Sequence, residues 1–287
     1  MTRALAMLVA GLVVAAGVFA ALSWVGGGDE EAAPVTTATQ AEPLRRLRVI
    51  FPEGFNIDEM ADRVAAVRTI AIERRGVTPR LTRAGYLRAV EAAVAPPRFR
   101  KDVRRDSLEG FLFPASYEFT QRTTAPELVA DQLAAFRTRF GSVNLAYARS
   151  KNLTPYDVLI IASMIEKETA VARERRLVAA VIYNRLRNRM ALQIDATTRY
   201  GLGIPGTESL TKAALRSSSP YNTRNRPGLP PTPIANPGLA SLRAAANPAR
   251  AVDFLYYVRK PGSLAHYFTA NESDFLRKVC EYGYACD

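Results

Sequence analysis

A glutamate that follows a long apolar run is the residue of this chain most suited to chemistry. Residues 158–165 are apolar apart from one serine, and Glu166 comes directly after them. A helix of this composition is expected to be buried all round, so the carboxyl of Glu166 should lie beside apolar side chains one and two turns earlier. Desolvation favours the neutral form of a carboxylic acid. The sequence therefore predicts a general acid at Glu166, of the kind that cleaves a glycosidic bond.

The start of this helix is marked by three residue types in order. Thr154 suits the N-cap, Pro155 suits the first helical position, and Asp157 suits the first turn, where the helix dipole favours an acid. A glutamate at a helix end is, however, usually a solvated terminus or half of an ion pair, because acids are rarely buried without a partner. Taken alone, the pattern leaves that alternative open for Glu166.

Polar segments further along the chain could supply the rest of a site. Residues 192–200 and 219–224 are dense in hydrogen-bonding side chains, and residues 228–238 form a proline-rich loop that should be stiff. Amide and hydroxyl groups suit the N-acetyl and hydroxyl groups of a sugar. The predicted substrate-cleft residues are Gln193, Asp195, Tyr221, Asn222 and Thr223, with Glu109 as a secondary candidate. Each of these side chains could instead cap a turn.

Six short blocks in a fixed order resemble a known family. They are EGFLFP at 109–114, ASMIEKET at 162–169, YNRL at 183–186, LQID at 192–195, SPYNT at 219–223 and GLPP at 228–231. In this order they resemble the endolytic murein transglycosylases of the YceG-like (MltG) family, over roughly residue 44 to the C-terminus. Ordered blocks are much harder to meet by chance than one short motif.

The resemblance implies a membrane-anchored lytic transglycosylase with Glu166 at the family's catalytic position. Such an enzyme cleaves the MurNAc-GlcNAc β-1,4 bond within nascent peptidoglycan strands, leaves a 1,6-anhydro-MurNAc end and terminates glycan elongation. Peptidoglycan glycan strands are the implied partners, with peptidoglycan synthases as further candidates, and no cofactor is expected. Two cysteines and one histidine also leave too few ligands for a zinc protease or a paired zinc site, so no metal is expected.

One carboxyl is enough for that reaction. The acid protonates the leaving oxygen and then, as a carboxylate, takes the proton of the muramic acid 6-hydroxyl, which attacks the same ring. Glu168 is the obvious second acid, but residues two apart on a helix point to different faces. Two alternatives stay open: a two-carboxylate glycoside hydrolase acting on the same glycan, and a non-catalytic wall-binding scaffold for synthases.

The N-terminal segment predicts an uncleaved membrane anchor. Residues 4–25 carry no charge, and about 20 helical residues cross a bilayer. Arg3 precedes this run and acidic residues 29–31 follow it, so the positive-inside rule leaves residues 1–3 in the cytoplasm and the body outside. Residues 26–43 have the composition of a flexible tether. The protein is therefore expected to cross the inner membrane once, with its catalytic domain on the periplasmic side.

Two folded parts are expected after the tether, giving an α+β fold overall. Residues 44–105 predict a small module with a strand at 47–51, a Pro-Glu-Gly turn, a helix at 57–67 and a second helix at 83–94. This module resembles the LysM-like module of the family, and it could bind glycan or serve only for packing. Residues 106–287 form the predicted larger α+β catalytic domain.

Charge and cysteine content add two expectations. The net charge is +12, but the arginines are scattered and no recognition motif accompanies them, so nucleic acid is not an expected partner. Positive charge outside a membrane could instead attract anionic lipid or the carboxylates of wall peptides. Cys280 and Cys286 are predicted to form a local disulfide in an oxidising compartment.

Overall fold

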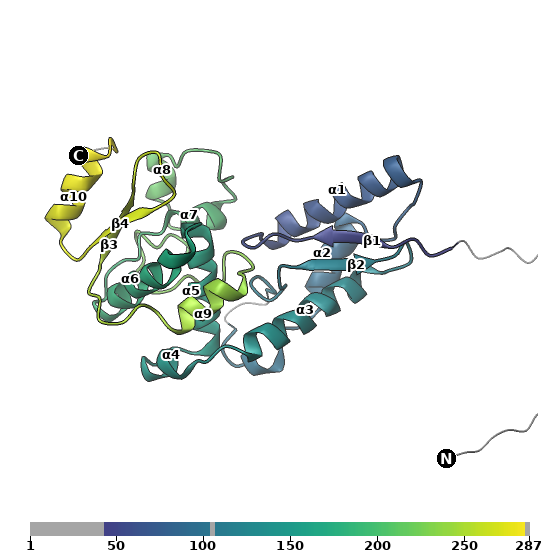
Figure 1. Ribbon diagram of the computed structural model, residues 1–287, viewed down its shortest axis with the longest axis horizontal. Coiled ribbons are helices and arrows are strands. Elements are labelled where there is room, and N and C mark those ends of the chain that lie inside the picture. Colours follow the sequence, from purple (N-terminus) through teal and green to yellow (C-terminus); the bar gives the residue numbers. More distant parts are fainter. Residues whose placement is uncertain (1–42, 104–106, 285–287) are drawn as a thin grey trace, which may run out of the picture. The chain divides into compact units, whose positions relative to one another are not determined.

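The computed structural model describes residues 43–103 and 107–284 of the 287. Their fold is mixed α+β and mainly helical, with short antiparallel strands (Figure 1). From Pro43 onward the described residues belong to one compact unit. Within them no helix is long and apolar enough to cross a membrane. The predicted segments at 1–3 and 4–25 lie outside the described residues, as does the tether apart from Pro43.

The first part of the described chain is an N-terminal module of two strands and three helices. Its elements are β1 (Leu47–Ile50), α1 (Ile57–Arg75), α2 (Arg83–Ala92), β2 (Ser116–Phe119) and α3 (Ala125–Gly141), with a 3-10 turn at Pro97–Phe99. β1 and β2 pair antiparallel, and the helices pack around them (Figure 1). The predicted boundary between residues 105 and 106 stays a prediction. β2, which completes the sheet, lies beyond that boundary.

Helix α1 is fixed at both ends by local interactions. The Glu59 N–H donates to Asn56 Oδ1 (2.8 Å) and the Asn56 N–H donates to Glu59 Oε2 (2.7 Å), which is a reciprocal capping box. Gly76 ends the helix in the left-handed conformation (φ 61°), which glycine adopts without strain. The helix therefore runs past the predicted end at residue 67, because nothing stops it before Gly76.

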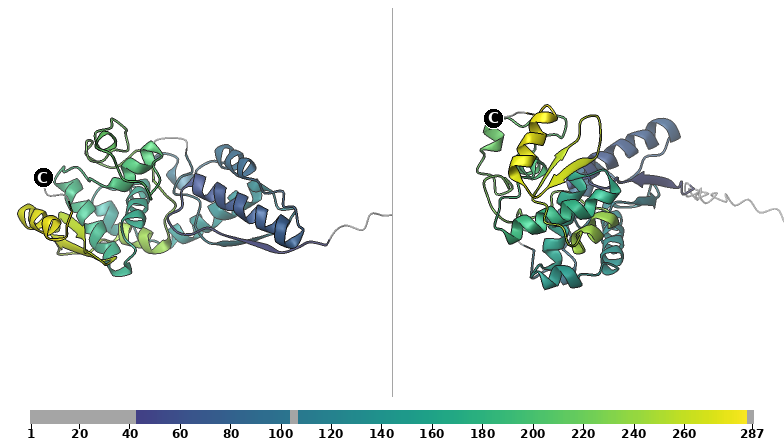
Figure 2. Two further views of the ribbon diagram at one scale, coloured as in Figure 1. Left: turned by 90° about the horizontal axis from the view of Figure 1, so that it is seen from above. Right: turned by 60° about the vertical axis from the view of Figure 1, so that its left-hand side comes forward.

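The second part of the chain is built around one buried helix. Its elements are α4 (Ala146–Ser150), α5 (Pro155–Glu168), α6 (Arg175–Arg187), α7 (Asp195–Leu202), α8 (Lys212–Leu215), α9 (Leu239–Ala246), β3 (Tyr256–Arg259), β4 (His266–Thr269) and α10 (Glu272–Glu281), with a 3-10 turn at Ala172–Glu174. α5 packs against α6, α7 and α9 (Figure 2). β3 and β4 form an antiparallel hairpin that α10 covers.

The predicted start and burial of α5 are both confirmed. Thr154 is the N-cap and forms a capping box with Asp157, and Pro155 is the first helical residue. Every residue from Tyr156 to Ile165 is buried. Glu166 and Glu168, on the last turn of α5, reach groups outside the apolar core, the Gly238 N–H and the Tyr257 hydroxyl.

The proline-rich loop joins the module to the end of α5. The Gly54 N–H donates to the Asn236 carbonyl, and the Asn236 N–H donates to the Phe55 carbonyl (both 2.9 Å). The Asn236 side chain also accepts from the Leu112 N–H (2.9 Å). Lys167 Nζ donates to the Gly54 carbonyl (3.2 Å). The Pro-Glu-Gly turn of the module is thereby held against the turn of α5 that carries the two candidate acids.

Candidate active site

Glu166 lies in a buried ion pair. Its side chain is 6% exposed, Oε1 is 3.7 Å from Nη2 of Arg175, and Oε2 accepts from the Gly238 N–H (2.9 Å). A Cβ at Gly54 would lie 3.4 Å from Glu166 Cγ, so the module turn packs directly on this side chain. These contacts are those of the ion pair that the sequence left open as an alternative.

A second acid from the module lies beside this pair. The carboxyl of Glu53 lies against Gly238, in the space that a Cβ there would take. Burial raises the pKa of Glu53, the negative charge of Glu166 raises it further, and Arg175 lowers it. Glu53, Glu166 and Arg175 therefore form one charge cluster at the junction of the two parts.

Glu168 has a different set of partners. Its Oε2 accepts a hydrogen bond from the hydroxyl of Tyr257 (2.8 Å), which lies on β3. Burial raises the pKa of Glu168 to about 7; the Tyr257 hydrogen bond lowers it, the charge of Asp195 raises it, and Arg224 lowers it. A carboxyl with a pKa near 7 can hold a proton and release it at neutral pH, as a general acid and base must.

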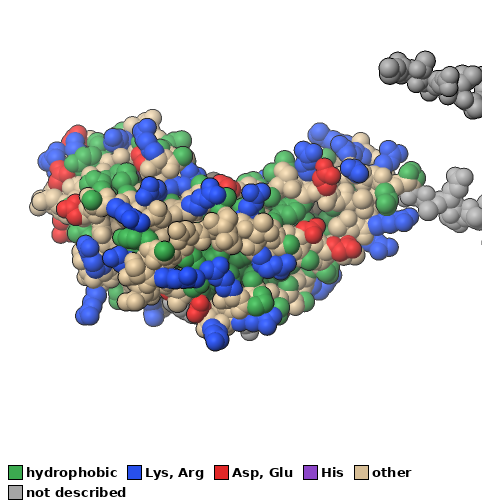
Figure 3. Space-filling model, turned by 60° about the horizontal axis from the view of Figure 1, so that its bottom comes forward, with side chains coloured by type: hydrophobic (Ala, Val, Ile, Leu, Met, Phe, Trp, Pro, Cys, Tyr) green, Lys and Arg blue, Asp and Glu red, His purple; other side chains and the backbone are tan. Residues whose placement is uncertain are grey.

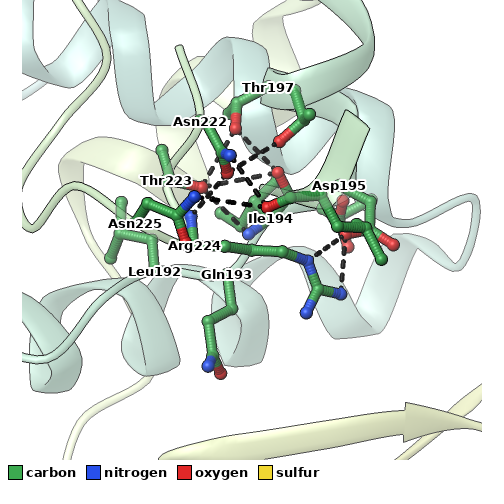
Figure 4. Close-up of polar contacts among 12 residues, drawn as sticks. Leu192, Gln193, Ile194, Asp195, Thr197, Asn222, Thr223, Arg224 and Asn225 are labelled. Atoms are coloured by element: carbon green, nitrogen blue, oxygen red, sulfur yellow. Dashed lines mark hydrogen bonds and ion pairs between the residues drawn. The ribbon is translucent and has the colours of Figure 1, made fainter. Parts of the chain in front are cut away.

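Gln193 and Asp195 belong to the same region as Glu168. Arg224 binds Asp195 Oδ1 through both Nε and Nη2 (2.8 Å each), and Arg185 Nη1 donates to Gln193 Oε1 (3.0 Å). Gln193 has φ 56°, an uncommon conformation for a residue with a side chain. Its exposed side chain points away from the buried network behind it (Figure 4). Arg185 thus holds the Gln193 side chain by its oxygen, and substrate binding by Gln193 stays a prediction.

Asn222 and Thr223 are buried and bond the chain itself. Asn222 Nδ2 donates to the carbonyls of Leu215 (3.0 Å) and Ser217 (2.9 Å). The Ile194 N–H donates to Thr223 Oγ1 (3.0 Å) (Figure 4). Both side chains are 2% exposed or less. They hold the segment that carries Gln193 and Asp195 in place, which is the structural role that the sequence left open for each of them.

Tyr221 and Glu109 both contact Tyr200 of α7. The hydroxyls of Tyr221 and Thr232 are 2.8 Å apart, and the ring of Tyr221 packs edge-on against Tyr200 (5.2 Å). Glu109 accepts from Asn236 Nδ2 (2.8 Å), from the Ile57 N–H and from the Tyr200 hydroxyl (3.2 Å each). Burial raises the pKa of Glu109 to about 8. Glu109 thus bonds the module to the second part of the chain, and its contacts do not bring it to Glu168.

Comparison with known proteins identifies the family. The model of the YceG-like family matches residues 30–281. The protein belongs to the YceG-like family. A YceG-like protein of Listeria monocytogenes, known from a crystal structure, superposes with a TM-score of 0.65 at 28% identity over 80% of this chain and 75% of that one.

Curated relatives of this YceG-like protein are named endolytic murein transglycosylases. That of Streptococcus pneumoniae (strain R6) is 32% identical over 268 residues, which are 90% of this chain and 46% of the relative. That of Bacillus subtilis (strain 168) is 35% identical over 162 residues, 56% of this chain and 44% of the relative. The chain therefore spans about half the length of the curated relatives that it matches.

Three side chains of this YceG-like site were not among the sequence-based candidates. Arg185 lies inside the YNRL block, and Arg224 directly follows the SPYNT block. Their place in the family blocks could have marked both as candidates, although their residue type alone could not. Tyr257 lies in a strand rich in aromatic residues, where nothing local separates it from Tyr256. Its role depends on contact with α5, which is distant in sequence.

Other predictions for this YceG-like chain concern ions and surface charge. Residues 43–103 and 107–284 contain no group of three His, Cys, Asp or Glu side chains placed to hold a metal ion. Lys and Arg side chains are scattered over the face in Figure 3 and are not gathered into one patch. Cys280 lies on α10, whereas its predicted disulfide partner Cys286 is outside the described residues.

Proposed function

We propose that this protein is a lytic transglycosylase that cleaves the MurNAc-GlcNAc β-1,4 bond within peptidoglycan strands. Membership of the YceG-like family and relatives named endolytic murein transglycosylases support this activity. The observation that carries the chemistry is Glu168, a carboxyl with a pKa of about 7 that is bonded to Tyr257 and lies near Asp195 and Arg224. No metal or cofactor takes part in the proposed reaction.

The proposed reaction uses Glu168 twice. Neutral Glu168 gives its proton to the glycosidic oxygen while the bond from that oxygen to C1 of MurNAc breaks. The 6-hydroxyl oxygen of the same MurNAc bonds to C1, and its proton passes to the Glu168 carboxylate. The products are a 1,6-anhydro-MurNAc end and a free 4-hydroxyl on GlcNAc. Water is not consumed and the acid is regenerated, because the nucleophile is tethered in the substrate.

The geometry supports Glu168 better than Glu166 for this role, and the assignment of Glu166 from the sequence stays a prediction. Both oxygens of Glu166 already have partners, Arg175 for Oε1 and the Gly238 N–H for Oε2. Among the described residues, Glu168 has a hydrogen-bond partner on Oε2 alone, the Tyr257 hydroxyl. The two-carboxylate hydrolase is not favoured, because the two acids contact different groups on different faces of α5.

Product mass tests the proposed reaction. Purified full-length protein in detergent, incubated with glycan strands, is expected to give ends that are lighter by one water than reducing ends, because the 6-hydroxyl replaces water as the nucleophile. Mass spectrometry of the digest makes the distinction. Products with ordinary reducing ends would mean hydrolysis, and strands that stay intact with bound protein would favour the wall-binding scaffold.

The surroundings of the enzyme are proposed from the sequence. The uncharged run at 4–25 supports a single-pass anchor in the inner membrane, with the described residues on the periplasmic side. We expect the full chain to stay with membranes in high salt and to be released by detergent. Recovery of a mature form that lacks residues 4–25 from the soluble envelope fraction would exclude the anchor. Peptidoglycan synthases remain proposed partners.

The N-terminal module is proposed to be LysM-like. Its order of strand, helix, helix and strand, in β1, α1, α2 and β2, supports that assignment. The contacts of Gly54 and Phe55 with Asn236, and of Gly54 with Lys167, support a role in packing against the catalytic part. The contacts of the module's Pro-Glu-Gly turn give no comparable support for glycan binding.

A further inference from the structure

Tyr257 is held in one orientation beside Glu168. Its hydroxyl donates to Glu168 Oε2 at 2.8 Å, although the two residues are 89 positions apart. Its ring packs edge-on against the ring of His266 (5.4 Å) and is 5.8 Å from that of Phe268. Tyr256, the next residue on β3, faces the other side of the hairpin and stacks on Phe275 of α10 (5.1 Å). The hairpin therefore presents one tyrosine hydroxyl to the end of α5.

Charged groups from three further elements face the same pair. Asp195 at the start of α7 and Arg224 in the following loop are bound to each other at 2.8 Å, and both charges act on Glu168. Arg185 of α6 faces the hydroxyl of Tyr257. On the hairpin itself, His266 is bound to the buried carboxylate of Glu174 (2.8 Å) rather than to Glu168. The Tyr257 hydroxyl and the Asp195–Arg224 ion pair thus both contribute to the electrostatic surroundings of Glu168.

We propose that Tyr257 is a positioning residue for the proposed reaction: its hydrogen bond to Oε2 makes Oε1 the oxygen of Glu168 that carries and transfers the proton. The inference rests on the proposed function and adds to it the role of the C-terminal hairpin. A neutral carboxyl has its proton on one oxygen only, and the oxygen that accepts from a hydroxyl is the other one. Among the described residues no hydrogen bond is made to Oε1 of Glu168, which leaves that atom for the substrate.

The same hydrogen bond suits both halves of the reaction. When Glu168 is neutral, the bond fixes the rotation of the carboxyl, and when Glu168 is charged, the bond stabilises the carboxylate. Burial and the negative charge of Glu168 raise the pKa of Tyr257 well above its ordinary value, so the hydroxyl remains a donor throughout. Burial raises the pKa of Glu168 and the Tyr257 bond lowers it. With the resulting pKa of about 7, Glu168 can be neutral or charged near neutral pH.

The test is the pH profile of kcat/KM for anhydro-ended product, measured with full-length protein in detergent. Catalysis needs neutral Glu168 at the start, so activity falls as pH rises through the pKa of this group. In Tyr257→Phe that alkaline limb should move up by about half to one pH unit, because a bond that favoured the carboxylate is lost. We expect kcat to fall about tenfold with KM nearly unchanged. Tyr256→Phe is the matched control and should leave the profile in place.

A second substitution tests the bond with no loss of shape. Replacement of Tyr257 by 3-fluorotyrosine makes the hydroxyl a stronger donor, so the alkaline limb should move down instead of up. Asp195→Asn should also move the limb down, because it removes a negative charge near Glu168 and leaves Arg224 unpaired. Opposite shifts from the phenylalanine and fluorotyrosine variants cannot come from a general loosening of the hairpin.

Two outcomes would overturn the inference. One is a Tyr257→Phe profile that coincides with the wild-type profile, and the other is a shift in the same direction for both Tyr257 replacements. Glu168→Gln separates these results from a failure of the proposed function. If that variant keeps its activity, Glu168 is not the acid; if it is inactive while the limb stays fixed in the Tyr257 variants, only the role of Tyr257 is excluded.

Discussion

Glu168→Gln should lower the rate of anhydro-end formation by about 10²–10⁴-fold, the usual contribution of a general acid and base. Glutamine keeps the size of the side chain and an acceptor for the Tyr257 hydroxyl, but it has no proton to give to the leaving oxygen. The fold should persist, since the Tyr257 hydroxyl, the one hydrogen-bond partner of Glu168 within residues 43–103 and 107–284, keeps its acceptor. Rates on purified glycan strands, with far-UV circular dichroism to check folding, make the measurement.

Glu166→Gln is the matched comparison for activity, because it makes the same chemical change two residues earlier. Its folded fraction should keep activity within about tenfold of wild type. Glutamine can still accept from the Gly238 N–H, so the junction with α9 loses only its charge interaction. If the folded Glu166 variant is inactive and the Glu168 variant is nearly normal, the assignment of Glu166 made from the sequence is the right one. If both variants are inactive and the wild-type products carry reducing ends, both carboxylates take part in catalysis.

Glu166→Gln should instead lower the free energy of unfolding, by about 2–3 kcal/mol. The side chains of Glu166 and Arg175 are 6% and 14% exposed, and removal of one partner from a buried pair usually costs about 3–5 kcal/mol. Glu53 remains beside Arg175 and compensates part of its charge, so the expected loss is smaller. Urea unfolding of the full chain in detergent, followed by circular dichroism, measures the change. Glu208→Gln, at an exposed position, is the control and should change stability by less than about 0.5 kcal/mol.

A double substitution shows whether the loss comes from the ion pair. Replacement of Arg175 by Met together with Glu166→Gln removes both charges, so much of the lost stability should return. Additive losses in the double variant would mean that the two side chains stabilise the junction independently. Glu53 lies in the same cluster, and its pKa is raised in part by the charge of Glu166, so the neutral Glu166 variant should also ease the ionisation of Glu53.

Features fixed by neighbours in the chain were predictable from the sequence. The start of α5 depends on Thr154, Pro155 and Asp157, which interact within a single turn, and its burial depends on a run that is apolar apart from one serine. The family resemblance was likewise carried by short blocks, and the match of the YceG-like family over residues 30–281 confirms it. The end of α1 was missed because no strong stop signal precedes Gly76, so the helix continues to Arg75.

The choice between Glu166 and Glu168 is what the sequence could not make. Residues two apart on a helix differ in direction by about 200°, so one of the two acids had to face the module and the other the hairpin. The apolar run before them gives both the same local surroundings. The two acids differ in their hydrogen-bond partners, which come from segments distant in sequence: Gly238 for Glu166 and Tyr257 for Glu168. Such long-range contacts exist only once the chain has folded, which is why the tertiary structure alone assigns an ion pair to one acid and a near-neutral pKa to the other.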